Sequence, residues 1–187
     1  MEEINQSLFL KLNSFTNTNS MLDFLGIIGA EYMPIVFIII EIYLFFFKKK
    51  KNIAIFAFMN MLLALGINQV IGWFYYHNRP FVDGLGNTIV NHVAENSFPS
   101  DHTTFMFAIA IYLYVKLDNK ILGESLLLLS LIGGLLRVFV GVHYPFDIAG
   151  SIFVSLIAFI IINKYEYKLQ ILNDFIIKTE ERIFKKI

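Results

Sequence analysis

Residues 21–51 read MLDFLGIIGAEYMPIVFIIIEIYLFFFKKKK, a long apolar run that ends in four consecutive lysines. About 20 mostly apolar residues are enough to span a bilayer as a helix, and lysines beside such a segment stay in the cytoplasm. Four further stretches have the same character, although the second of them is short: Ile53–Tyr76, His102–Val115, Ile121–Val142 and Phe146–Ile162. The sequence therefore predicts an all-α, polytopic membrane helical bundle with about five transmembrane helices.

The composition also indicates residence in a membrane. The chain has 187 residues, of which 57% are hydrophobic and 16% charged, whereas a soluble domain is about 25% charged. Its formal net charge is zero, which argues against nucleic acid as a partner. The absence of cysteine excludes disulfides and thiolate chemistry. This length predicts a single membrane-embedded domain over residues 1–187.

The basic residues are distributed unevenly. Lys and Arg in short loops stay inside the cell, so the side that collects them is predicted to be cytoplasmic and the 76–100 loop extracellular. An interfacial helix is expected at residues 4–16, and it would be a sixth span if it inserts. The transmembrane core is expected at residues 21–163, and a cytoplasmic amphipathic tail follows at 164–187. With five crossings, 12 of the 15 Lys and Arg residues share one side: Lys48, Lys49, Lys50, Lys51, Lys116, Lys120, Lys164, Lys168, Lys178, Arg182, Lys185 and Lys186.

Three polar strings lie at the predicted extracellular ends of the helices. They are NRPF at 78–81, FPSDHTT at 98–104 and RVFVGVHYPFD at 137–147, and all four histidines of the chain lie on this side. Ionisable residues in or beside spans are costly, which favours a functional role. Pro99 and Ser100 are typical of the entry and N-cap of a helix.

The side chains of these strings suit a phosphoryl group. An arginine offers a planar fork of donors that matches phosphate oxygens, and a helix N-terminus adds backbone N–H groups. One histidine could attack phosphorus as a neutral imidazole while a second protonates the leaving oxygen. An aspartate beside the attacking histidine would fix its tautomer. Positioning and electrostatics carry most of phosphoryl transfer, so the site is expected to need no metal and no cofactor.

In order and spacing, the three strings resemble the signature of the type 2 phosphatidic acid phosphatase superfamily. That signature is Lys-x6-Arg-Pro, then Pro-Ser-Gly-His, then Ser-Arg-x5-His-x3-Asp. Within the superfamily, YHNRPFV at 76–82, SFPSDHTT at 97–104 and GVHYPFD at 141–147 look most like the undecaprenyl-diphosphatases associated with bacitracin resistance in Gram-positive bacteria. The resemblance covers nearly the whole chain.

The resemblance implies a role for each matching residue. His143 would be the nucleophile that forms a phosphohistidine, Asp147 would orient it, and His102 would be the general acid. It also implies the reaction, hydrolysis of the lipid undecaprenyl diphosphate to undecaprenyl phosphate and phosphate at the outer leaflet of the cell membrane, which recycles the carrier of peptidoglycan synthesis. The residues that would bind the transferred phosphate are Arg79, Ser100 and Arg137.

Three positions depart from the superfamily pattern. Gly72 stands in place of the lysine, Asp101 in place of the glycine of the second block, and Leu136 in place of the serine of the third. Gly72 offers no side chain to phosphate, so His77, Asn78 or a different geometry of the site is a candidate replacement.

Glu31, Asp101 and His77 are accessory candidates. Glu31 lies about ten residues into the first span, where it either faces the site or is a protonated or internally bonded group.

Three other functions stay open. The first is a related lipid phosphatase that acts on phosphatidylglycerophosphate or phosphatidic acid. The second is a non-catalytic anion-binding membrane protein or transporter. The third is a metalloenzyme that uses the motif histidines and Asp147, against which stands the lack of a metal-spacing motif such as His-Glu-x-x-His. The oligomeric state is likewise open.

Overall fold

The computed structural model describes residues 1–46 and 50–184, and these residues form helices and loops without a strand. The predicted all-α bundle is confirmed. Of the basic residues counted above, Lys48, Lys49, Lys185 and Lys186 lie outside the described residues. The helices are α1 (Glu2–Asn13), α2 (Ser20–Phe46), α3 (Lys51–Phe74), α4 (Asp101–Lys116), α5 (Lys120–Phe139) and α6 (Pro145–Phe184).

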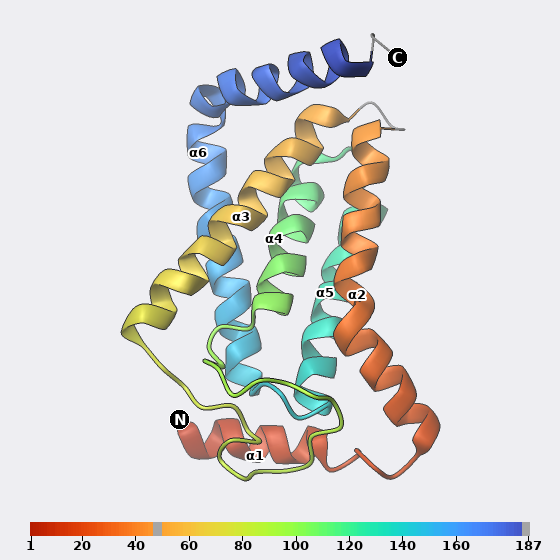
Figure 1. Ribbon diagram of the computed structural model, residues 1–187, viewed down its shortest axis with the longest axis vertical. Helices are drawn as coiled ribbons and strands as arrows, with labels where there is room; N and C mark the ends of the chain where they lie inside the picture. Colours follow the sequence, from red (N-terminus) through yellow and green to blue (C-terminus); the bar gives the residue numbers. More distant parts are fainter. Residues whose placement is uncertain (47–49, 185–187) are drawn as a thin grey trace.

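Four of the described helices, α2, α3, α5 and α6, are long and apolar enough to cross a membrane. α4, with 16 residues, rises only about 24 Å. It nevertheless lies along the bundle axis in the middle of the bundle, antiparallel to α3 and α5 (Figure 1), and most of its residues from Thr103 to Leu113 are buried. The short third stretch of the sequence is therefore the central helix of the bundle.

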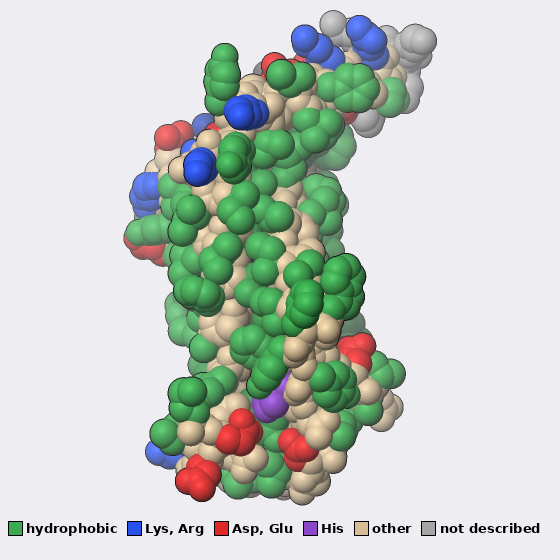
Figure 2. Space-filling model, turned by 90° about the vertical axis from the view of Figure 1, so that its left-hand side faces the viewer, with side chains coloured by type: hydrophobic (Ala, Val, Ile, Leu, Met, Phe, Trp, Pro, Cys, Tyr) green, Lys and Arg blue, Asp and Glu red, His purple; other side chains and the backbone are tan. Residues whose placement is uncertain are grey.

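The surface of the bundle is as apolar as its interior. Phe37, Phe56, Met106 and Leu126 belong to one buried cluster, while large apolar side chains such as Ile160 remain more than half exposed. Figure 2 shows hydrophobic side chains covering the middle of the visible face. Soluble proteins do not expose apolar surface on this scale, and the chain is a multi-pass membrane protein.

Helix α1 lies across one end of the bundle instead of running along it (Figure 1). Phe9 is fully buried and meets the ring of Tyr144 edge-on, with 5.4 Å between the centroids. The Asn13 amide donates to the carbonyl oxygens of Phe139 and Asn87, each at 2.8 Å. These contacts fix α1 to the chain around the end of α5, so the option of a sixth span does not apply.

The opposite end carries the basic residues. Lys50 pairs with Asp118 at 3.2 Å, and Lys116 pairs with Glu166 at 2.5 Å. α6 is one continuous helix whose C-terminal part turns across this end (Figure 1), and this part includes most of the amphipathic tail that the sequence predicted from residue 164. On the face seen in Figure 2, blue Lys and Arg side chains gather mainly here.

Candidate active site

The polar strings meet at the end of the bundle that α1 covers. Arg79 follows α3, Ser100 caps α4, Arg137 lies in the last turn of α5, and Asp147 lies in the first turn of α6. The turn after α5 depends on Gly141, whose φ is +89° and where a Cβ would collide with the carbonyl oxygen of Asn87. This turn brings the residues after α5 back beneath the helix ends.

His143 and Asp147 form a fully buried pair. His143 Nδ1 lies 3.2 Å from Asp147 Oδ2, and Nε2 lies 3.1 Å from Nη1 of Arg79. A guanidinium has only donors, so Nε2 must be the acceptor and Nδ1 must carry the proton. The pair therefore holds His143 as the tautomer whose Nε2 lone pair faces the arginine, which is the tautomer that a nucleophilic imidazole needs.

Burial sets the charge of His143. Loss of hydration lowers the pKa of His143 to about 3, although its hydrogen bond to Asp147 opposes that change. The imidazole is therefore neutral at neutral pH, with its lone pair available. Burial also lowers the pKa of Arg79, but a guanidinium stays protonated.

The Arg79 guanidinium contacts four groups. Besides meeting His143, Nη1 donates to the carbonyl oxygen of Val142 at 3.0 Å, and Nη2 donates to Glu95 Oε1 at 3.2 Å and to the carbonyl oxygen of Asn96 at 3.3 Å. Its Nε is buried without a hydrogen-bond partner. Glu95 is more than half exposed, so it occupies an anion position on Arg79 from the solvent side.

Arg137 is the largest fully buried side chain. Its Nη1 donates to Glu31 Oε1 at 2.5 Å, while Nε and Nη2 have no partner. Glu31 therefore faces the site and pairs with an arginine, one of the two roles the sequence left open. Unpaired buried donors are costly, and Nε of Arg79 is the third such donor on the two arginines.

Ser100 and His102 stand at the N-terminus of α4. The Ser100 Oγ accepts from the Thr103 amide at 3.4 Å and from the Thr103 hydroxyl at 3.0 Å, which confirms the predicted N-cap. Because both bonds are accepted, the Ser100 hydroxyl proton is left to donate. His102 is partly exposed in the first turn and lies within electrostatic range of Arg79 and Arg137.

Sequence reasoning missed Ser97 and Asn96. The Ser97 hydroxyl donates to Asp147 Oδ2 at 2.6 Å, and Asn96 pins the loop by donating to the carbonyl oxygens of Tyr75 and Phe98 at 3.1 and 2.9 Å. Ser97 directly precedes the second string, and nothing in its residue type marks it. Only its position beside Asp147 in the folded chain does.

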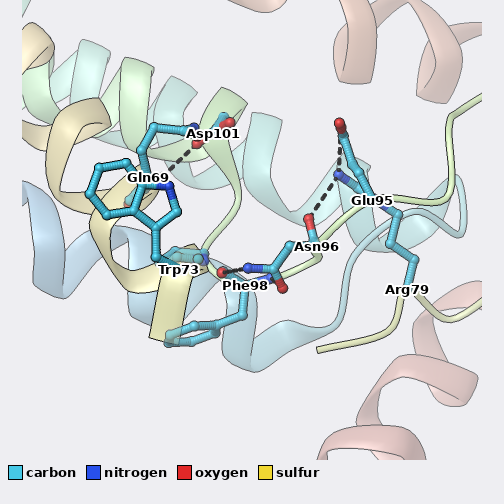
Figure 3. Close-up of a pocket in the computed structure, with 10 residues that line it drawn as sticks. Gln69, Trp73, Arg79, Glu95, Asn96, Phe98 and Asp101 are labelled. Carbon is cyan, nitrogen blue, oxygen red and sulfur yellow. Dashed lines mark hydrogen bonds and ion pairs between the residues drawn. The ribbon is translucent and has the colours of Figure 1, made fainter. Parts of the chain in front are cut away.

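A pocket of about 230 Å³ opens beside Arg79. Figure 3 shows Gln69, Trp73 and Asp101 on one side of it and Arg79 and Glu95 on the other. The family lysine would stand in this pocket, at Gly72, where a Cβ would meet the Asn96 amide nitrogen at 3.2 Å.

The suggested lysine replacements do not reach this pocket, because the Asn78 amide is bonded to Asp83 at 2.8 Å and His77 faces Asp147 and Glu2. Asp101 lines the pocket and accepts from Asn68 at 2.8 Å, which ties α4 to α3. Within the described residues, no group of three or more His, Asp or Glu side chains is placed to hold a metal ion.

The helical bundle and its cluster of arginine, histidine and aspartate define a membrane-embedded phosphatase. Residues 53–171 match the PAP2 superfamily, and the chain belongs to it.

The chain is similar to its relatives over nearly its full length. It is 31% identical to undecaprenyl-diphosphatase BcrC of Bacillus subtilis, over 98% of this chain and 95% of that protein. It is 27% identical to a protein of Bacillus licheniformis named bacitracin transport permease protein BcrC, over 97% and 91%. The crystal structure of Aquifex aeolicus LpxE has a TM-score of 0.70 and 27% identity, covering 87% of this chain and 96% of that one.

Proposed function

We propose that the protein hydrolyses undecaprenyl diphosphate to undecaprenyl phosphate and phosphate. The observation that carries the proposal is a buried His143 whose Nε2 meets Arg79, with the buried Arg137 within electrostatic range and unpaired donors on both arginines. The similarity to the undecaprenyl-diphosphatase of Bacillus subtilis favours this substrate. A terminal phosphoryl group of a diphosphate also leaves more easily than that of a monoester, because the leaving group is itself a phosphate.

In the first step, Nε2 of His143 attacks the terminal phosphorus. The Nε2–P bond forms, the bridging P–O bond breaks, and His102 gives its proton to the departing undecaprenyl phosphate. Asp147 accepts the hydrogen bond from Nδ1 and stabilises the positive charge that develops on the ring. Arg79 leaves Nε2 for the phosphoryl oxygens, which Arg137 and Ser100 also bind.

In the second step, water attacks the phosphohistidine. His102, now neutral, takes a proton from the water as its oxygen bonds to phosphorus, and the Nε2–P bond breaks. Phosphate leaves, and His143 and His102 return to their starting protonation states. The two steps change no oxidation state and consume one water. The two arginines would neutralise the charge of the transferred group.

We place the site at the outer leaflet of the cell membrane. The site lies at the end of the bundle opposite the paired lysines Lys50, Lys51 and Lys116. Lys and Arg in short loops stay in the cytoplasm, which supports an extracellular position for the site. A carrier lipid released on that face would be available for recycling in cell-wall synthesis.

Two other functions use the same site. A related phosphatase would prefer phosphatidylglycerophosphate or phosphatidic acid. A transporter would bind an anion without chemistry, and the Bacillus licheniformis relative is named as a transport permease. A transporter gains nothing from an imidazole held as a nucleophile, so we favour hydrolysis.

The test is phosphate release by the purified protein in detergent with EDTA. Undecaprenyl diphosphate, phosphatidylglycerophosphate and phosphatidic acid are compared at equal surface concentration, with wild type and His143→Ala. We expect the highest kcat/KM on the diphosphate and loss of release in His143→Ala. A higher rate on phosphatidic acid refutes the substrate, and unchanged release by His143→Ala refutes the mechanism.

A further inference from the structure

The two oxygens of Asp147 are used differently. Oδ2 accepts from the Ser97 hydroxyl at 2.6 Å and the Tyr144 amide at 2.8 Å, and it lies 3.2 Å from His143 Nδ1. Oδ1 is buried and has no hydrogen-bond partner. His77 Nδ1 is also buried without a partner, and it lies 3.6 Å from this oxygen. Two unsatisfied buried polar atoms therefore face each other behind the catalytic pair.

We propose that His77 is a positioning residue, which in its protonated form holds Oδ1 of Asp147 and so keeps Oδ2 directed at His143. The inference rests on the proposed function, because it assigns His77 a part in forming the phosphohistidine. His77 does not touch the substrate or the reacting atoms. It acts through Asp147 alone, from the side of the carboxylate away from the arginines.

The backbone sets the position of the His77 ring. The His77 amide donates to Asn96 Oδ1 at 2.9 Å, and its carbonyl oxygen accepts from the Ser97 amide at 2.8 Å. His77 and Ser97 are thus joined side by side, and each addresses one oxygen of Asp147. The Asp147 carboxylate therefore lies between His77 and Ser97, whose positions relative to each other are fixed by their backbone hydrogen bond.

Helix α1 completes the surroundings of His77. Glu2 Oε1 lies 3.6 Å from Nε2, so each ring nitrogen faces a carboxylate. Two tyrosine rings lie beside the His77 ring. Tyr75, just after α3, is stacked with 6.2 Å between the ring centroids, and Tyr144, just before α6, is tilted with 5.1 Å between the centroids. The Tyr144 hydroxyl donates to Asp83 at 2.9 Å, so it brings no charge to His77.

A protonated His77 satisfies this geometry and a neutral one does not. The imidazolium has N–H groups on both nitrogens, whereas the neutral ring has one. The Asp147 carboxylate, followed by Glu2, raises the pKa of His77 above its ordinary value of 6.5, although partial burial works against them. When pH rises through this raised pKa, one carboxylate loses its donor. The stabilisation of the fold and the alignment of Asp147 that His77 supplies are therefore complete below pH 6.5. Both are lost as pH rises through the raised pKa of His77.

The kinetic test compares kcat and KM across pH 5–10 for wild type, His77→Gln, Glu2→Gln and the control Glu3→Gln. Glu3 is the exposed neighbour of Glu2 in α1. Glutamine keeps a donor for Oδ1 but does not titrate. We expect wild-type kcat to fall by about tenfold on the alkaline side, with KM unchanged.

The variants should separate alignment from a merely structural role. His77→Gln should lose the part of the alkaline fall that is due to His77 and keep only the part due to the general acid His102. Glu2→Gln should move the part due to His77 to lower pH, and Glu3→Gln should match wild type. An alkaline limb in His77→Gln identical to that of wild type overturns the inference. So does an equal loss of kcat at every pH, which is the result of a general structural defect.

A second readout does not depend on hydrolysis. NMR titration of the four histidines, with His77→Gln to assign the signal, should give His77 a pKa above 6.5 that falls in Glu2→Gln and in Asp147→Asn. A His77 pKa that is ordinary and unaffected by both variants contradicts the inference. If the His77 pKa falls in both variants but wild type releases no phosphate, the proposed function is refuted. The contact between His77 and Asp147 is then established all the same.

Discussion

Arg79 donates a hydrogen bond to the His143 nitrogen that would attack phosphorus, with 3.1 Å between Nη1 and Nε2. The arginine that would bind the phosphate therefore covers the nucleophile before substrate arrives. A phosphoryl group would draw the guanidinium onto its own oxygens and free the lone pair. The same contact explains how a buried imidazole is kept in one tautomer in the absence of substrate.

Arg79→Lys tests this double role. Lysine keeps the positive charge but lacks the planar fork that could bridge Nε2 and phosphoryl oxygens. Loss of one transition-state donor typically lowers kcat by about 10²- to 10³-fold, and we expect a fall in this range from steady-state phosphate release. Lys11→Gln on α1 is the control. A kcat within threefold of wild type would contradict a direct role for the fork.

On the proposed mechanism, Glu95 would compete with the substrate for Arg79. Its carboxylate is bonded to Nη2 at 3.2 Å from an exposed loop. Glu95→Gln removes the competing charge, so we expect a lower KM with little change in kcat, by a few-fold because exposed ion pairs contribute about 1 kcal/mol or less. Glu124→Gln on the exposed surface of α5 serves as the control. A higher KM in Glu95→Gln would show that Glu95 helps substrate bind.

Glu31 stabilises a charge that is completely buried. Arg137 is 0% exposed, and Glu31 is its acidic partner. Glu31→Ala leaves a guanidinium without that partner, and breaking such a pair costs about 3 kcal/mol. We expect a lower thermal midpoint and a lower kcat/KM, with Glu31→Gln keeping most of both. Equal stability of wild type and Glu31→Ala would contradict the pairing.

The low pKa of His143 predicts an acid-side effect on stability. Its folded pKa of about 3 lies below the ordinary value of 6.5, so the stability supplied by the neutral ring is present above 6.5 and is lost as pH falls towards 3. The thermal midpoint, followed by Trp73 fluorescence, should therefore fall on acidification more steeply in wild type than in His143→Gln. If the thermal midpoint falls equally steeply with pH in both proteins, protonation of the His143 ring does not destabilise the fold, which contradicts the prediction.

The sequence predicted most of the site because its members lie at helix ends. Arg79, Arg137, His143 and Asp147 stand at fixed spacings from the apolar stretches, so one membrane topology places them all at one end. Ser97 was missed because only the folded loop brings its hydroxyl to Asp147.

The pairing of Glu31 with Arg137 could not be read from the sequence either, since 106 residues separate the two and the contact depends on how α2 packs against α5.

The terminal helices were the least predictable elements of the fold. Amphipathic patterns suggested that both lie on membrane surfaces, yet α1 buries Phe9 and Asn13 against the site end of the bundle. Asn173, in the C-terminal part of α6, is bonded to Asn52 at 2.6 Å. Hydrophobic periodicity shows that a helix has an apolar face, but it does not tell whether lipid or protein covers that face.

Trapping the phosphoenzyme tests the central claim most directly. Wild type and His143→Gln are mixed with undecaprenyl diphosphate labelled in its terminal phosphate, quenched in alkali within milliseconds, and mapped by mass spectrometry. We predict a phosphoryl group on His143 of wild type, stable in alkali and labile in acid, and none in His143→Gln. Phosphate release by wild type with no labelled protein at any quench time, or with label on another residue, would contradict the account.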